Sequence, residues 1–127
     1  MADSVRLVRS NELVPGQPTP GMNRLEAFAS GSLWAGMVRT EPGMVSGWHH
    51  HGDHHSIIHM VVGTMRMESG PGGGDVAEAG PGDFFHIPPM AIHRESNPGS
   101  DEASGVVVRF GTGDVVVNVD GPEGTSE

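Results

Sequence analysis

The sequence predicts an all-β protein, built as a sandwich or barrel of short strands. Its 127 residues include 20 glycines and 10 prolines, which interrupt the chain too often for long helices. Between them lie short runs rich in apolar and β-branched side chains, several of which alternate between apolar and polar positions. The length fits one domain over residues 1–127, and we expect disorder at about 1–4 and in the acidic end at 121–127.

About nine or ten strands are expected along the chain. A short strand at 5–8 is followed by a proline-rich connector at 11–21 and by a strand at 32–40. Both faces of the run 55–62 are mostly apolar, so we expect both to be buried. The glycine-rich stretch 69–74 lacks the lysine of a phosphate-binding loop and predicts a hairpin connection. The remaining expected strands are 64–68, 76–79, 83–87, 93–96, 105–110 and 115–119.

Charge and composition limit the class of partner. Seven basic residues against sixteen acidic ones give a formal net charge of −9, which argues against nucleic acid or an anionic membrane surface. No apolar run approaches the roughly 18 residues that a membrane span needs, and the N-terminus does not resemble a signal peptide. The absence of cysteine excludes thiolate zinc sites and fits a reducing compartment. We therefore expect a cytoplasmic protein that binds neither nucleic acid nor a membrane.

The most unusual feature is a cluster of histidines, since five of the chain's eight lie within residues 49–55. In an extended strand, side chains two residues apart leave the same face, with Cα atoms roughly 6.5 to 7 Å apart. His49 and His51 can therefore bind one ion, while His50 points away. A turn after His51 would let either His54 or His55 supply a third imidazole. The cluster predicts a metal site with nitrogen ligands.

Two separated motifs resemble those of the cupins. The first motif of that family is Gly, five residues, His-x-His, three or four residues, Glu, six residues and Gly. Here Gly43 is followed after five residues by His49 and His51, and Gly63 closes the motif after one extra residue.

The second motif keeps every spacing of the family. It runs from Gly82 through Pro88 to His93 and Asn97, and Met90 stands where the family has a turn glycine. We expect Met90 to keep an ordinary backbone angle. The resemblance, which covers about residues 43–97, implies a small jelly-roll barrel, the cupin double-stranded β-helix.

The resemblance also implies a site with four ligands for one divalent ion. The family's glutamate ligand falls on His55, or on Ser56 when the count starts from Gly63. An imidazole is a better ligand than a hydroxyl, so we expect His55. Four neutral ligands would leave the full charge of the ion to attract anionic oxygens. Imidazoles suit Fe, Zn, Mn, Ni or Cu. The expected metal ligands are His49, His51, His55 and His93.

For function, the resemblance favours a dioxygenase-like oxidoreductase acting on a small organic molecule. The alternatives are a redox-neutral zinc cyclase or isomerase, as in polyketide pathways, and a binding module without turnover. His59 shares the face of His55, so it is either an acid/base group in the cavity or a hydrogen-bonded core histidine. We also expect a homodimer, with the N-terminal strands covering the partner. The expected apolar lining of the cavity is Trp34, Met37, Ile57, Met65 and Phe84.

Overall fold

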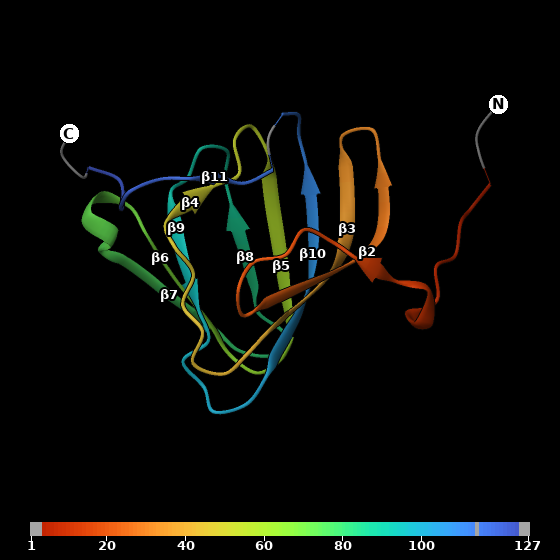
Figure 1. Cartoon of the computed structure of the whole chain (residues 1–127), viewed down its shortest axis with the longest axis horizontal. Helices are drawn as coiled ribbons and strands as arrows, with labels where there is room; N and C mark the ends of the chain where they lie inside the picture. The colour runs from red at the N-terminus through yellow and green to blue at the C-terminus, as the bar shows by residue number, and fades with distance from the viewer. Residues whose placement is uncertain (1–3, 114, 125–127) are drawn as a thin grey trace.

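The computed structural model describes residues 4–113 and 115–124, and folds them into two antiparallel sheets (Figure 1). One sheet has six strands in the order β1-β2-β3-β10-β5-β8, and the other has five in the order β11-β4-β9-β6-β7. This is the jelly-roll double-stranded β-helix that the two motifs implied. The strands are β1 (Val14–Pro15), β2 (Met22–Ser30), β3 (Leu33–Thr40), β4 (His49–His50), β5 (His55–Val62), β6 (Met65–Ser69), β7 (Asp75–Ala79), β8 (Phe84–Ile87), β9 (His93–Ser96), β10 (Ala103–Phe110) and β11 (Val117–Asn118).

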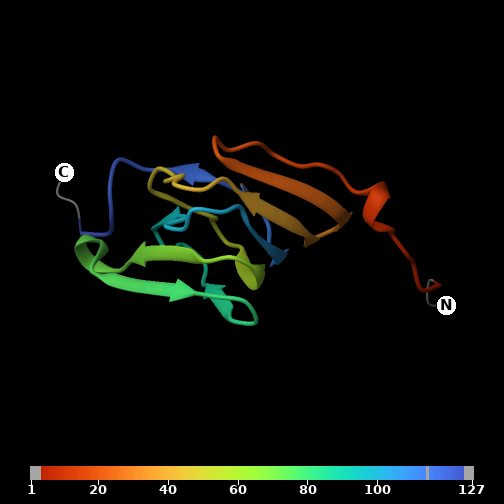
Figure 2. The ribbon, with the colours of Figure 1, turned by 90° about the horizontal axis from the view of Figure 1, so that it is seen from below.

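Most expected strands are present, and the main differences lie near the N-terminus. Residues 5–8 form no strand, and this segment extends away from the barrel (Figure 2). The long strand β2 was not expected, because Asn, Glu and Ala within it are poor strand formers; its pairing with β3 stabilises it instead. At the other end, residues 121–124 form turns rather than disorder, and the carbonyl of Glu123 accepts a hydrogen bond of 2.7 Å from Gly72 N. Residues 1–3 and 125–127, also expected to be disordered, lie outside the described residues.

The core lies between the two sheets and is filled largely by methionine. Flexible thioethers suit this role because the chain has few aromatic residues to fill the same space. No helix in the described part of the chain is long and apolar enough to span a membrane. The buried apolar residues are Met22, Val38, Ile58, Met60, Met65, Met67, Ala79, Ile87, Ala103 and Val107.

The six-stranded sheet buries only its inner face. On β5, Ser56, Ile58 and Met60 point inward and are buried, whereas Ile57 is 37% exposed and Val61 46% exposed. In the single chain, the expectation that both faces of residues 55–62 are buried is therefore wrong. The outer face of the sheet remains apolar and open.

The motif residues outside the histidines shape turns. Gly43, Gly63 and Gly82 have φ angles of +77°, +79° and +91°, in the region that glycine adopts without strain. A Cβ on Gly63 would also lie 2.7 Å from the Cβ of Ala103. The buried side-chain amide of Asn97 donates to the carbonyls of Thr40 and Asp101 at 3.2 and 2.9 Å. These residues hold the connections that position β4 and β9.

Met90 adopts a left-handed conformation with φ +63°, so the expectation of an ordinary backbone angle is wrong. The turn keeps the geometry of the family's glycine, since Met90 N donates to the carbonyl of Gly52 at 2.8 Å. For a residue with a Cβ this conformation costs roughly 1 to 2 kcal/mol. The side chain is 61% exposed and contributes little packing in return.

Met90→Gly is therefore expected to raise the free energy of unfolding by about 1 kcal/mol, because it removes the Cβ that strains the turn. Urea denaturation measures the change. Met90→Ala is the matched control, since it shortens the side chain but keeps the Cβ, and should give no comparable gain. An equal gain in both variants would show that the exposed side chain, not the backbone, is the cause.

Candidate metal centre

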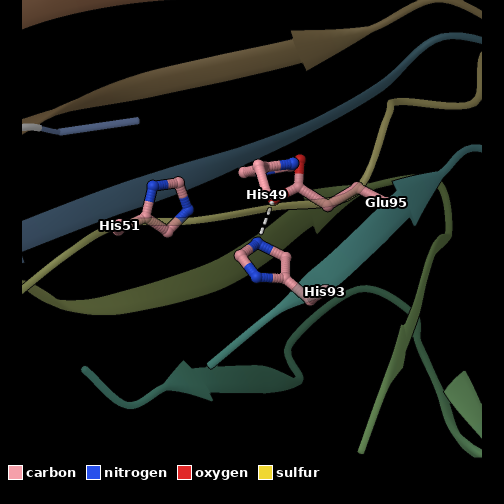
Figure 3. Close-up of side chains that lie close together, drawn as sticks. All are labelled: His49, His51, His93 and Glu95. Atoms are coloured by element: carbon pink, nitrogen blue, oxygen red, sulfur yellow. Dashed lines mark hydrogen bonds and ion pairs between the residues drawn. The ribbon is translucent and has the colours of Figure 1, made fainter. Parts of the chain in front are cut away.

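Strands β4 and β9 bring four potential ligands together. His49 and His93 lie directly opposite each other in the β4–β9 ladder. His51 follows His49 by two residues, and Glu95 follows His93 by two residues on the same face of β9. One ligand atom from each of these residues lies within 4.8 Å of the others, and all four residues are buried (Figure 3).

The three imidazoles are oriented by backbone carbonyls. In each ring the Nδ1 lies within hydrogen-bonding distance of a carbonyl oxygen. A ring that donates its Nδ1–H in this way is the tautomer whose Nε2 keeps a lone pair, which is the form that ligates metal. The contacts are His49 to Gly47 at 3.0 Å, His51 to Val115 at 2.7 Å and His93 to Ala91 at 2.9 Å.

The carboxylate of Glu95 faces these Nε2 atoms. Its Oε1 lies 3.1 Å from Nε2 of His93 and 3.7 Å from Nε2 of His49. Its Oε2 is buried without a hydrogen-bond partner. Two lone-pair atoms at 3.1 Å repel unless a proton or a cation lies between them. The donor set of three imidazoles and one carboxylate, with an unpaired buried oxygen, fits a divalent transition-metal ion.

The protonation of the centre is set by this cluster. Burial acts to raise the pKa of Glu95, but hydrogen bonds and charges from His49 and His93 outweigh it and hold the pKa well below its usual range. Burial acts to lower the pKa of His49, and Glu95 outweighs it, so that this pKa lies above 6.5. Burial and then the charge of Arg109 lower the pKa of His51 to about 3. His51 is therefore neutral near pH 7, whereas the raised pKa of His49 means that protons compete with an ion for this ligand.

Of the expected ligands, His49, His51 and His93 come together and His55 does not. Strand β5 begins at His55 with this side chain on the outer face, while Ser56 points inward and is fully buried. The His55 ring stacks on Phe110, and its Nδ1 lies 3.1 Å from Nε2 of His86. The strand alternation thus removes His55 from the centre, and Glu95 supplies the fourth donor.

Glu95 was missed although the sequence carried a signal for it. Residues 93–96 were expected to be a strand, and alternation in such a strand places Glu95 beside His93. The spacing of the first motif instead predicted His55, on β5, as the fourth ligand.

The expectation that His59 enters the cavity is not met. His59 lies on the outer face of β5, with its ring 4.3 Å from that of Phe84. The residue that does line the cavity is His54, the alternative third ligand; it is buried, and its Nδ1 lies 2.9 Å from the carbonyl of His51. His54 is therefore outside the metal cluster but next to it.

A cavity of about 660 Å³ opens beside the centre. It is joined to the cluster through Val115, which lines the cavity and whose carbonyl holds His51. Of the expected apolar lining, Trp34 is present, Met65 is in the core, and Met37, Ile57 and Phe84 lie on the outer sheet face. The cavity also contains Arg24, Glu26 and Arg109.

Comparison with known proteins gives a consistent picture of the fold. A family model described as a cupin domain matches residues 36–109. KdgF from Halomonas sp. is 22% identical, with a TM-score of 0.72 over 87% of this chain and 97% of that one. A sugar phosphate isomerase of the cupin superfamily from Silicibacter pomeroyi is 21% identical, with a TM-score of 0.63 over 74% and 62%. A mutant of Bacillus subtilis oxalate decarboxylase OxdC is 19% identical, with a TM-score of 0.69 over 84% and 30%. No curated protein matches the chain.

Proposed function

The chain belongs to the cupin family, and from this premise we propose that it is a metal-dependent, dioxygenase-like oxidoreductase acting on a small organic molecule. The observation that carries the proposal is the buried cluster of His49, His51, His93 and Glu95 beside a cavity of ligand size. A redox-active divalent ion held by these residues would supply the activation of dioxygen.

Glu95 favours oxidative chemistry. A carboxylate ligand lowers the net charge of a divalent site by one relative to four imidazoles, and so stabilises a higher oxidation state of the ion. It also makes the ion a weaker Lewis acid, which is a disadvantage for redox-neutral polarisation of a carbonyl. The change from His55 to Glu95 therefore supports the oxidoreductase over the cyclase.

Protein groups around the cavity have separate roles. The carbonyls of Gly47, Ala91 and Val115 fix the imidazole rings, and the ring of Trp34 covers one wall of the cavity. His54 donates its Nδ1–H to the His51 carbonyl, which leaves its Nε2 as a proton acceptor. This Nε2 forms no hydrogen bond with a described residue, and His54 lines the cavity. We assign to it the proton that a substrate hydroxyl or enol loses on binding.

The redox-neutral alternative rests on the same histidine. A proton acceptor beside a cation site also suits proton transfer between carbon and oxygen, as an isomerase requires. One of the structural neighbours is named a sugar phosphate isomerase. In that case oxygen would play no part in the reaction.

Metal content and oxygen uptake distinguish the oxidoreductase from the redox-neutral isomerase or cyclase. Protein purified without added metal is analysed for its elements, loaded anaerobically with Fe(II), and tested for oxygen uptake with a panel of enolic and phenolic compounds. The same panel is followed by NMR under anaerobic conditions with Zn(II) protein. Uptake that is lost in His54→Asn at unchanged iron content supports the proposal. Conversion only in the anaerobic zinc protein would make the enzyme an isomerase or cyclase.

We further propose that a second copy of the chain covers the outer face of the six-stranded sheet. Its outward positions on β3, β10, β5 and β8 are mostly apolar, and Phe84 is 68% exposed. None of these described positions is acidic, although the chain carries a net charge of −9. Two such faces can therefore meet without repulsion between carboxylates.

Light scattering at micromolar concentration is expected to give twice the chain mass of 13.3 kDa. Phe84→Asp should give a monomer, because it would bury a charge in each copy of the interface. Val76→Asp is the matched control, since Val76 is 50% exposed on the other sheet, and should leave the dimer intact. A monomeric wild-type protein would contradict the proposal.

A further inference from the structure

Two buried arginines line the cavity beside the metal centre, Arg24 on β2 and Arg109 on β10. Only 7% and 6% of their surfaces are exposed. The guanidinium of Arg109 lies 5.8 Å from the centre of the Trp34 ring. Burying a guanidinium is costly unless an opposite charge compensates it. Two such groups in one cavity therefore require an explanation.

Their partners within the described part of the chain are neutral. Arg109 Nε donates to Ser56 Oγ at 3.0 Å, and Arg24 Nη1 donates to the Gln17 carbonyl at 3.2 Å and to Thr19 Oγ1 at 2.8 Å. Neither arginine forms an ion pair with a carboxylate of the described residues. The Nη atoms of Arg109 form no hydrogen bond with a described residue, and Arg109 lines the cavity.

The charged side chains of the described cavity lining leave a single positive charge. Besides the two arginines, the described lining contains Glu26 and His54. Glu26 accepts a hydrogen bond of 2.7 Å from Trp34 Nε1. Burial and then the charge of Arg24 lower the pKa of Arg109 to about 10, so Arg109 is still charged near pH 7. Among the described lining residues, the two arginines and the carboxylate of Glu26 leave one positive charge, and the carboxylate of Glu95 in the metal cluster also acts on Arg109.

We propose that this cavity binds a small organic acid whose carboxylate is held by Arg24 and Arg109. A guanidinium presents paired N–H donors that match the two oxygens of a carboxylate. One carboxylate neutralises the single positive charge, whereas a phosphate monoester would add excess negative charge near Glu26. The volume of about 660 Å³ leaves room for an apolar body against Trp34 and Leu33. That the bound acid is a substrate rests on the function proposed above, whereas the binding of the acid is argued from the residues of the cavity.

Binding of acids and of their amides tests the proposal directly. Benzoate, phenylacetate and pyruvate are titrated into metal-free and Zn(II)-loaded protein by calorimetry, alongside benzamide, phenylacetamide and phenyl phosphate. At least one acid should bind about tenfold or more tightly than its amide and than phenyl phosphate. Arg109→Gln and Arg24→Gln should each remove this preference at unchanged zinc content. Arg66→Gln, on β6 of the other sheet and outside the cavity lining, is the matched control and should keep it.

Each outcome decides the question. Equal binding of acids and amides overturns the proposal, and so does an acid preference that survives both arginine variants. If phenyl phosphate binds more tightly than the acids, the proposal of a carboxylate ligand is wrong and the cavity binds a phosphate ester instead. Circular dichroism checks folding, and Arg24→Gln serves if Arg109→Gln does not fold. Acid binding that depends on the arginines, without oxygen uptake or anaerobic conversion, would refute the enzymatic function but not this site. Oxidation of neutral compounds that is unaffected by Arg109→Gln would refute this site but not the enzymatic function.

Discussion

Replacing His93 with alanine is expected to lower the affinity for a divalent ion by on the order of 100-fold or more. His93 lies opposite His49 in the sheet and 3.1 Å from Glu95, so its loss removes one ligand and leaves the carboxylate with a single imidazole neighbour. The measurement is elemental analysis after dialysis, followed by competition titration with Zn(II). The wild-type protein should retain about one equivalent per chain, as four donors around one ion require.

His55→Ala is the matched control for this experiment. It removes a histidine from the same cluster in the sequence, but the structure places that side chain on the outer face against His86 and Phe110. Its metal content and affinity should equal those of the wild-type protein. Loss of metal in His55→Ala together with retention in His93→Ala would show that the centre is assembled differently.

Glu95→Gln is expected to weaken metal binding by about 10- to 100-fold, because an amide oxygen replaces an anionic ligand. It should also change the dependence of binding on pH. In the wild-type protein Glu95 raises the pKa of His49 above its ordinary value, so protons compete with metal as the pH falls through this raised pKa. Without the carboxylate, burial is the largest remaining effect on His49 and lowers its pKa, aided by the charge of Arg24 and opposed by the hydrogen bond to Gly47. The variant should therefore lose its remaining affinity only at a lower pH than the wild-type protein.

Zn(II) titrations between about pH 5 and 8 measure both effects, a range that brackets the ordinary pKa of histidine. Glu78→Gln is the matched control, since Glu78 is exposed on β7 and changes the net charge of the chain by the same amount. It should leave affinity and pH dependence unchanged. If Glu95→Gln binds metal like the wild-type protein at every pH, Glu95 is not a ligand, and the argument for oxidative chemistry from its charge fails.

The sequence by itself determined the fold and most of the metal centre. Glycine and proline turns between short apolar runs predicted the β-barrel, and motif spacing together with the two-residue period of a strand predicted His49, His51 and His93. These signals are local: each depends on residues close together in one strand or turn. The turn glycines Gly43, Gly63 and Gly82 are of the same kind, because their positive φ angles follow from the connections that they make.

Only the tertiary structure decided which side chains meet across strands. Whether β5 begins with His55 or Ser56 on its inner face depends on its register with β10, where Arg109 opposite Ser56 fixes the alternation. Glu95 enters the centre because β9 pairs with β4, a contact between segments more than 40 residues apart. The two arginines come from β2 and β10, which have no common pattern in the sequence but share one cavity. Strand register is set by the packing of whole sheets, so a fixed spacing along the chain could identify the family of the site but not its fourth ligand or the charge of its cavity.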